Sequence, residues 1–227
     1  MNVSAFIPAK MTSRRLPGKN MKPFNGKPLL HYSIRAAQKT PSIQSIIVSS
    51  EDSGPLDVAR SYGVTAFERP KNLSGAETLI AEVMQFHYTS MESMPDIVVL
   101  LQPTHPLRFP EELERSIQAF QASDCDCMFA VAEEDVLLGT ISNGRYIPEF
   151  PMPRDKNREP VRYRNTGNFY LFRPERTFLA GLPFGRVFGA YPLASPELEV
   201  DIDYPEQFVL AERILRAYQD RFTDIIT

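Results

Sequence analysis

Apolar and polar positions along this chain fall into two alternating patterns. Residues 3–7 read Val-Ser-Ala-Phe-Ile, a nearly continuous apolar run that is typical of a buried strand. Residues 29–39 follow Pro28 and repeat apolar side chains every three or four positions, which predicts a helix. The same two patterns predict strands at 44–49, 64–67, 96–101, 128–132, 168–172 and 187–191, and helices at 56–62, 110–121 and 205–218. We therefore expect an α/β fold, with a mainly parallel sheet and helices on both of its faces.

One further helix is predicted from its capping sequence. Ser74-Gly75-Ala76-Glu77 has the spacing of a capping box, so a helix is expected from this point to about residue 89. His87 falls on the apolar stripe of that helix. Such a position is more typical of a partly buried histidine with satisfied hydrogen bonds than of a ligand.

Both patterns are lost between residues 133 and 165. Four prolines and several basic residues fall in this stretch, and no clean period remains. A structureless loop of this length is uncommon inside a compact domain. We therefore expect one domain over residues 1–227, with an arm or flap inserted at 133–165 that becomes ordered by packing on something else. A second subunit is the obvious candidate, which would make it a dimerisation arm.

The composition narrows the class of protein. A chain of 227 residues with 43% hydrophobic residues can bury a core, and a net charge of −3 argues against nucleic-acid binding through a broad basic face. No apolar run approaches the ~18 residues of a membrane span, and the first residues do not resemble a signal peptide. Cys125 and Cys127 are too close in sequence for a good disulfide, and we expect two reduced thiols in a cytoplasmic protein.

Basic residues crowd into one short loop after the first predicted strand. They are Lys10, Arg14, Arg15, Lys19 and Lys22, with no acid among them. Like charges repel, so this crowding indicates an anion such as a triphosphate, around which Ser13 and Gly18 would let the backbone turn closely. In an α/β sheet the loop lies at the carboxyl end of its strand, where ligands bind. The alternative is a solvated basic turn without a ligand.

A stiff polar loop follows the predicted strand at 96–101. It reads Gln102-Pro103-Thr104-His105-Pro106-Leu107-Arg108, and its prolines would hold Gln102 and Thr104 as hydrogen-bonding groups at the ligand edge of the sheet. Arg108 is expected to pair with a carboxylate or to cap a local acid. A rigid turn without a ligand is the alternative.

Two carboxylates form a third group near the end of the chain. In an extended segment Asp201 and Asp203 face one side and Ile202 the other, and hard oxygen ligands at this spacing suit Mg²⁺. Asp203 also opens a capping box with Glu206, so it could instead cap the last helix, or do both. Arg69 follows the third strand and either joins this edge of the sheet or forms a surface salt bridge.

The three groups together fit a nucleotidyltransferase. This chemistry needs a triphosphate held in place, its charge neutralised, and an incoming oxygen aligned with the leaving pyrophosphate.

The chain also resembles a known family. Ile7-Pro8-Ala9-Lys10 and the segment Ser13-Arg14-Arg15-Leu16-Pro17-Gly18-Lys19-Asn20 resemble the opening motif of the acylneuraminate cytidylyltransferases, which make CMP-sialic and CMP-legionaminic acids. Gln102-Pro103-Thr104 resembles their second motif, and Val200-Asp201-Ile202-Asp203 their third. The motifs stand in the family's order and span nearly the whole chain.

The resemblance implies a reaction and a set of residues. CTP and an acidic nine-carbon 2-keto-3-deoxy sugar would give a CMP-sugar and pyrophosphate with Mg²⁺, in a homodimer whose arm reaches over the partner's site. Nucleotide binding would fall to Lys10, Ser13, Arg14, Lys19, Asn20 and Arg69. Gln102, Thr104 and Tyr170 would contact the sugar, and Asp201 and Asp203 would hold the metal. The expected catalytic set is Lys19, Gln102 and Asp201, and one carboxylate is expected to help deprotonate the anomeric hydroxyl.

Some positions depart from the family pattern. Lys10 replaces the usual arginine, so a bidentate phosphate contact is lost. His105 stands where a small residue is usual, and Thr166-Gly167 replaces a common Asn-Gly pair. The acidic residue that octulosonate enzymes carry in the second motif is missing, which argues against that substrate.

Two other functions stay open from the sequence. A GT-A type glycosyltransferase could use Asp201-Ile202-Asp203 as its D-x-D motif, although that motif normally lies in mid-chain. A non-catalytic nucleotide-binding subunit would bind CTP and release no pyrophosphate.

Overall fold

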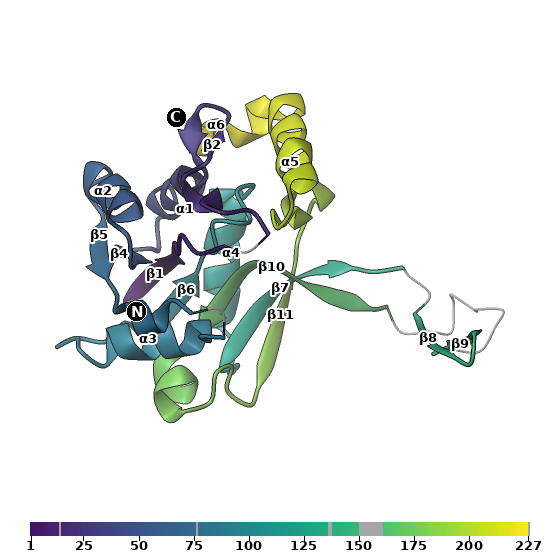
Figure 1. Ribbon diagram of the computed structural model, residues 1–227. Coiled ribbons are helices and arrows are strands. Elements are labelled where there is room, and N and C mark those ends of the chain that lie inside the picture. Colours follow the sequence, from purple (N-terminus) through teal and green to yellow (C-terminus); the bar gives the residue numbers. More distant parts are fainter. Residues whose placement is uncertain (14, 76, 136–137, 150–160, 227) are drawn as a thin grey trace.

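A seven-stranded sheet forms the centre of the molecule, in the strand order β11-β7-β10-β6-β1-β4-β5 (Figure 1). The computed structural model describes residues 1–13, 15–75, 77–135, 138–149 and 161–226. The sheet strands are β1 (Val3–Pro8), β4 (Ser45–Ser50), β5 (Thr65–Glu68), β6 (Ile97–Leu100), β7 (Cys127–Glu133), β10 (Tyr163–Phe172) and β11 (Phe188–Pro192).

Most neighbouring strands run parallel. β1 pairs in parallel with β4 and β6, β4 with β5, and β7 with β11. β10 alone is antiparallel to its neighbours in this sheet, β6 and β7. The mainly parallel α/β sheet expected from the sequence is therefore confirmed, with one antiparallel strand that the sequence pattern did not predict.

Helices cover both faces of the sheet, as expected. They are α1 (Leu29–Gln38), α2 (Ser53–Ser61), α3 (Ile80–Tyr88), α4 (Pro110–Gln121), α5 (Pro205–Ala217) and α6 (Thr223–Ile226). Short 3-10 turns are η1 (Lys19–Met21), η2 (Lys71–Leu73), η3 (Pro174–Arg176), η4 (Phe178–Ala180), η5 (Pro196–Glu199) and η6 (Gln219–Phe222).

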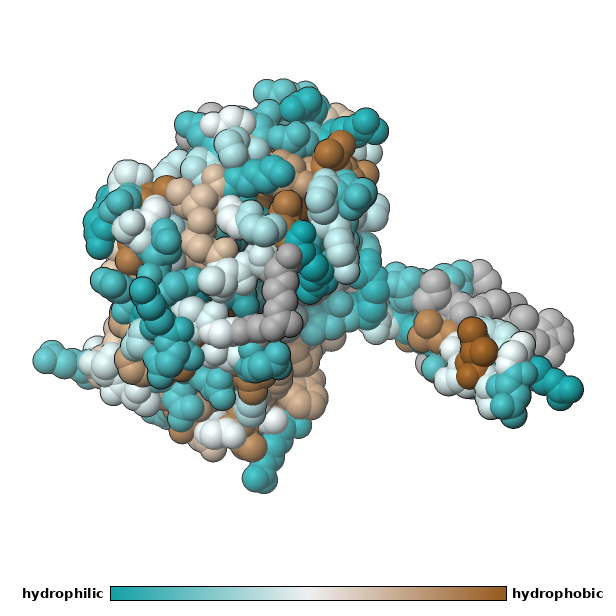
Figure 2. Space-filling view, in the orientation of Figure 1, coloured by the Kyte–Doolittle hydropathy of each residue, from teal (hydrophilic) through white to brown (hydrophobic). Residues whose placement is uncertain are grey.

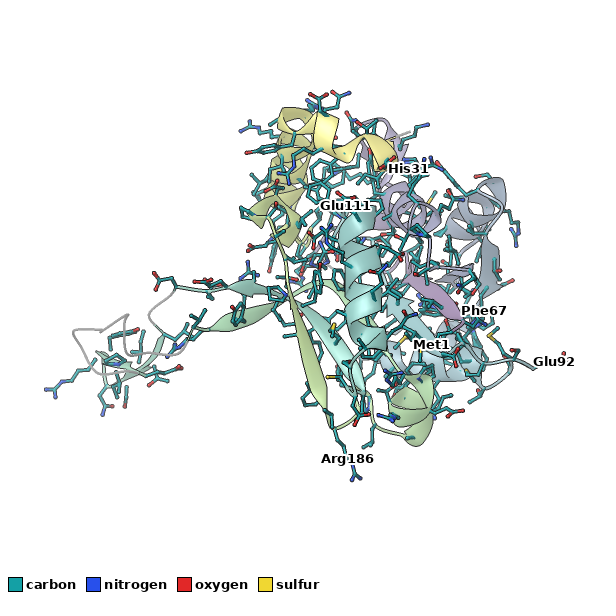
Figure 3. The ribbon with its side chains drawn as sticks, turned by 180° about the vertical axis from the view of Figure 1, so that it is seen from behind. Met1, His31, Phe67, Glu92, Glu111 and Arg186 are labelled. Atoms are coloured by element: carbon teal, nitrogen blue, oxygen red, sulfur yellow. The ribbon has the colours of Figure 1, made fainter. Side chains whose placement is uncertain are left out.

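The side chains of β1 show how the two faces are filled. Val3, Ala5 and Ile7 point into a core shared with α1, α4, α5 and α6, whereas Phe6 points to the opposite face and packs with α3 and η4. Figure 3 shows α4 lying across the first of these faces, with Glu111 near its start. β1 is buried on both sides, which places the loop after it at the centre of one sheet edge.

The C-terminal helix α6 packs against α1. His31 on α1 lies beside the C-terminal helices (Figure 3), with Nε2 2.9 Å from the carbonyl oxygen of Ile225 and Nδ1 in a hydrogen bond with the Tyr62 hydroxyl. Burial lowers the pKa of His31. None of the helices in the described residues has the length and apolar character needed to span a membrane.

The helix predicted to start at Ser74 begins six residues later. The Ser74 hydroxyl does not cap a helix, because it is bonded to Arg69 and Glu51 instead. The helix α3 starts at Ile80, where the Glu82 carboxylate accepts the Leu79 backbone N–H at 3.0 Å. The intervening segment is left free to line a cleft.

His87 is buried on α3, but its hydrogen bonds are not satisfied as expected. It is packed between aromatic rings, and within the described residues neither ring nitrogen has a partner. Burial lowers its pKa to about 4, so the ring is neutral.

Two small hairpins are formed by strands that were not predicted individually, although a flap was expected at 133–165. β2 (Pro23–Phe24) pairs with β3 (Lys27–Pro28) before α1, and β8 (Gly139–Ser142) pairs with β9 (Arg145–Pro148) within the expected arm. The second hairpin lies away from the sheet, beyond the extended ends of β7 and β10 (Figure 1). The amino-terminal part of β10, from Tyr163, also belongs to this region and starts earlier than the predicted strand at 168–172.

Candidate active site

One cleft collects most of the side chains singled out in the sequence. It has a volume of about 710 Å³ and opens at the carboxyl ends of β1, β5 and β6, because the loops after these strands line it. The sequence-predicted residues that line it are Lys10, Ser13, Arg15, Lys19, Asn20, Arg69, Gln102, Thr104, Asp201 and Asp203. Cations from the start of the chain and carboxylates from its end therefore share one site.

Lys19 joins the two ends of the chain directly. Its ammonium nitrogen lies 2.9 Å from Asp203 Oδ1 and 2.9 Å from the carbonyl oxygen of Ile202. Arg15 reaches the other carboxylate oxygen of Asp203 at 2.7 Å. Burial alone would raise the pKa of Asp203, but Lys19 and Arg15 bring it below its usual value.

Asp203 does not cap α5, the helix that one sequence-based alternative expected it to cap. The helix α5 is capped by Gln207, whose Oε1 accepts the backbone N–H groups of Asp203 at 2.7 Å and Tyr204 at 2.8 Å. The carboxylate of Asp203 is thus left for the two cations and for the cleft.

Asp201 has a different environment from Asp203. Its Oδ1 atom is buried, with no hydrogen-bond partner in the described part of the chain. Burial raises the pKa of Asp201, and the neighbouring charge of Asp203 adds to this, while the nearby Thr104 hydroxyl opposes it. The free oxygen is suited to a cation.

Asp201 and Asp203 suit Mg²⁺, whose coordination is commonly completed by a substrate. They do not suit a metal ion that needs all its ligands from protein side chains. No group of three or more His, Cys, Asp or Glu side chains comes together as a metal site among the residues described. Mg²⁺ is commonly held by one or two carboxylates and completed by substrate phosphates. Asp201 and Asp203 can supply the protein's share of such a site.

The second and third motifs are tied together through their backbones. Ile202 donates its N–H to the carbonyl oxygen of Thr104 at 2.8 Å. Since Ile202 is fully buried, Asp201 and Asp203 are held on either side of an anchored residue and both border the cleft.

Arg108 is a structural residue here and does not pair with a carboxylate. It is 1% exposed and donates to the carbonyl oxygens of Asn168 and Gln102 and to the Ser33 hydroxyl. Burial lowers its pKa to about 9. Its bonds hold the backbone of Gln102 against β10, which positions the Gln102 side chain at the cleft.

Arg69 is neither a surface salt bridge nor a free cation. Its guanidinium is buried, donating to Glu51 Oε2 at 2.8 Å and to Ser74 Oγ at 2.9 Å. Glu51 also accepts the backbone N–H of Met11 at 3.0 Å, and Arg69 helps to hold the pKa of Glu51 below its usual value against the effect of burial. Glu51, which the sequence analysis missed, thus connects Arg69 to the basic loop.

Asn20 also supports the basic loop. Its amide nitrogen donates to the carbonyl oxygen of Lys10 at 2.8 Å, while its buried Oδ1 has no hydrogen-bond partner in the ranges described. An unpaired acceptor at the wall of the cleft is available to a ligand or water.

The positions of two expected site residues at the cleft are not confirmed. Arg14 lies outside the described residues. Tyr170 is not among the lining side chains; its ring packs edge-on against Phe129, with centroids 5.7 Å apart. A contact between Tyr170 and a sugar stays a prediction.

One wall of the cleft was missed by sequence reasoning. It comes from η2, the segment before α3 and the first turns of α3, and consists of Leu73, Gly75, Glu77, Thr78, Leu79, Ile80 and Val83. The signal for this wall was the Ser-Gly-x-Glu sequence, which reads equally well as a capping box. This wall is less charged than the basic loop.

His105 lies behind the cleft. It is 2% exposed, with Nε2 2.8 Å from the carbonyl oxygen of Thr166 and Nδ1 3.2 Å from the Thr104 hydroxyl. Burial and the charge of Arg108 lower its pKa to about 3. The two departures from the family pattern, at 105 and at 166–167, are therefore in contact.

The chain shares sequence and fold with known cytidylyltransferases. A CMP-N,N'-diacetyllegionaminic acid synthase from Legionella pneumophila is 27% identical over 97% of this chain and 99% of its own length. A pseudaminic acid cytidylyltransferase from Campylobacter jejuni is 34% identical over 56% of each chain.

Among solved structures, a CMP:2-keto-3-deoxy-manno-octonic acid synthetase in complex with CTP superposes with a TM-score of 0.74. It covers 96% of this chain and 99% of its own at 16% identity, which shows a shared fold. The cytidylyltransferase family model matches residues 4–143, which include the basic loop and the second motif. This chain belongs to the cytidylyltransferase family and is an enzyme of that class.

Proposed function

We propose that this enzyme transfers CMP from CTP to the anomeric hydroxyl of an acidic nine-carbon 2-keto-3-deoxy sugar. The observation that carries the proposal is the meeting of the basic loop with Asp201 and Asp203 in one cleft. A cation-rich loop suits the triphosphate, and carboxylates beside it suit the metal that accompanies a triphosphate.

The cleft offers separate surfaces to the parts of the nucleotide. Lys10, Ser13, Arg15 and Lys19 can neutralise and orient the phosphates. Lys19 is held by Asp203 before any ligand arrives, so little reorganisation is needed when negative charge builds up. The less charged wall from Leu73 to Val83 suits the nucleoside.

Asp201 and Asp203 would hold Mg²⁺. When bound, the ion would neutralise charge on the transferring phosphate and on the leaving pyrophosphate. Of the two carboxylates, Asp201 has the raised pKa and the unpaired oxygen, whereas Asp203 is already paired with Lys19 and Arg15. Asp201 is therefore also the better candidate to accept the proton of the anomeric hydroxyl.

The reaction is a single displacement. The anomeric oxygen of the sugar forms a bond to the α-phosphorus of CTP, the bond from that phosphorus to the β-phosphate oxygen breaks, and pyrophosphate leaves. The hydroxyl proton goes to a carboxylate or to water. Gln102 and Thr104 lie beside the carboxylates and would orient the sugar.

Legionaminic-type acids are the preferred acceptors. The Legionella relative aligns over nearly the full length of both chains, whereas the pseudaminic relative aligns over little more than half. We would screen pyrophosphate release from CTP and Mg²⁺ with legionaminic, sialic, pseudaminic and octulosonic acids. Release with a nine-carbon acid supports the proposal; binding of CTP with no release for any acid would favour a non-catalytic subunit.

The active form is proposed to be a homodimer joined through the 133–165 arm. The β8–β9 hairpin exposes large apolar side chains, with Ile141 81% and Ile147 51% exposed, and hydrophobic residues gather on it in Figure 2. A hairpin of this size is marginal on its own. A second copy would cover it, and the arm would reach over that copy's cleft.

We place the reaction in the cytoplasm, where CTP is available. Cys125 and Cys127 are both free thiols, which agrees with a reducing compartment.

A further inference from the structure

His105 is a buried polar side chain next to the cleft that the proposed reaction leaves unused. Its two ring nitrogens have different partners: the carbonyl oxygen of Thr166 on β10 and the hydroxyl of Thr104 at the cleft. These partners determine what each nitrogen can do.

The Thr166 carbonyl decides which nitrogen carries the proton. A carbonyl oxygen only accepts hydrogen bonds, so Nε2, at 2.8 Å, must donate. A neutral imidazole has one N–H, and Nδ1 then carries a lone pair. The Thr104 hydroxyl at 3.2 Å is therefore the donor to Nδ1.

The backbone of β10 holds the ring in this orientation. Gly167 has a φ of 77°, and a Cβ placed there would lie 2.9 Å from Cε1 of His105 and 3.2 Å from Nε2. Only glycine combines this backbone conformation with so close an approach. A side chain at position 167 would therefore push the His105 ring out of this orientation.

We propose that His105 is a positioning residue that makes the Thr104 hydroxyl a hydrogen-bond acceptor toward the substrate. Nδ1 takes the only proton of that hydroxyl, and the remaining lone pairs of Oγ1 face the cleft. Thr104 then selects a substrate that presents an O–H or N–H donor at this point. This inference rests on the proposed function and adds to it the polarity of one sugar contact.

Asp201 competes for the same proton. Its carboxylate lies close enough to Thr104 to accept from it, and its Oδ1 is 3.8 Å from Nδ1 of His105. The hydroxyl has one proton, so His105 and Asp201 cannot both receive it. With the proton on the His105 side, Asp201 receives no donor from either neighbour and keeps its oxygens for a cation.

The tautomer can be measured in the unmodified protein without a substrate. Side-chain ¹⁵N resonances of the three histidines would be assigned with His31→Gln and His87→Phe variants. For His105 we expect a protonated Nε2 and an unprotonated Nδ1 near neutral pH. A proton on Nδ1 would overturn the inference, whatever the enzyme's substrate.

Two substitutions separate the role of Nδ1, which accepts from Thr104, from the role of Nε2, which anchors the ring to Thr166. His105→Gln keeps an N–H for Thr166 and removes the acceptor near Thr104, whereas His105→Asn keeps an acceptor near Thr104 and loses the bond to Thr166. We expect His105→Gln to raise KM for the sugar about tenfold, with KM for CTP little changed. His105→Asn should have the smaller effect on the sugar.

A double substitution tests whether His105 acts through Thr104. In a Thr104→Val background, His105→Gln should cause no further loss. Losses that multiply, or a His105→Gln variant that binds sugar normally, would contradict the proposal. If the variants fail to fold, the ¹⁵N measurement on the parent protein can still overturn the proposal, because a protonated Nδ1 cannot accept a hydrogen bond from Thr104.

Discussion

Asp201 and Asp203 have the same side chain and different surroundings. Asp203 is paired with Lys19 and Arg15, whereas a buried oxygen of Asp201 has no hydrogen-bond partner in the described residues. Substitution at the two positions should therefore have different consequences.

Asp201→Asn should lower Mg²⁺-dependent turnover by about a hundredfold or more, while the protein stays folded. The reason is that the amide removes the negative charge from the oxygen best placed for a cation. Pyrophosphate release measured across a range of Mg²⁺ concentrations would show this. Asp203→Asn is the matched comparison: besides removing the other proposed Mg²⁺ ligand, it should raise KM for CTP, because Lys19 and Arg15 lose their anchor.

His87 should make the protein less stable in acid. Its folded pKa is about 4 against an ordinary 6.5, so below pH 6.5 the unfolded chain binds a proton that folded His87 refuses. The free energy of unfolding therefore falls between pH 6.5 and 4, by up to about 3 kcal/mol from this group. His31 and His105, whose pKa values are also lowered, act in the same direction.

His87→Phe isolates this contribution. The variant should lose about 2 kcal/mol less than the parent between pH 7 and pH 5 in chemical denaturation. The same dependence on pH in both proteins would show that His87 is not buried in its neutral form.

At the scale of helices and strands, the sequence predicted an element correctly where contacts between residues close in sequence determine it. The helix at 110–121 was predicted to the residue, because Pro110 can start it and its apolar stripe is regular. The helix start at Ser74 was wrong, because the Ser74 hydroxyl bonds to Arg69 and to Glu51, and a capping pattern does not reveal that Glu51, 23 residues earlier, is brought beside it. The same holds for β10, whose antiparallel pairing with β6 and β7 depends on the rest of the sheet.

In the candidate site, too, residues with a local sequence signal were predicted, whereas a residue that depends on tertiary contacts was missed. The basic loop, Gln102, Thr104 and the two aspartates were found from charge and spacing. Glu51 was not, because an acid near the end of β4 carries no signal until the fold places it beside Arg69 and Met11.

Glu51→Gln should loosen the basic loop. It leaves the buried guanidinium of Arg69 without its counter-charge, so we expect a loss of roughly 3 kcal/mol in stability and a higher KM for CTP. Denaturation curves and CTP titration would measure both. Asp57→Asn breaks an exposed ion pair with Arg60 and should change neither quantity. Equal effects of the two substitutions would contradict a special role for Glu51.

At the scale of the whole molecule, the β8–β9 hairpin of the arm exposes apolar side chains that a second copy of the chain is proposed to cover. Ile141→Asp places a charge on its exposed apolar side and should shift a dimer toward monomer in sedimentation velocity. Ser61→Asp adds the same charge at an exposed position of α2, away from the arm, and should leave the dimer intact. A parent protein that is monomeric at every concentration would exclude the proposed dimer.

The fold brings the two ends of the chain together around one cleft, and the central claim is that both ends act on one nucleoside triphosphate. Calorimetric titration of CTP with and without Mg²⁺ tests it most directly, using the parent, Lys19→Met and Asp201→Asn. Lys19→Met should weaken CTP binding in both conditions, whereas Asp201→Asn should remove only the increment that Mg²⁺ adds. An increment that survives in Asp201→Asn, or CTP affinity unchanged in Lys19→Met, would contradict the account.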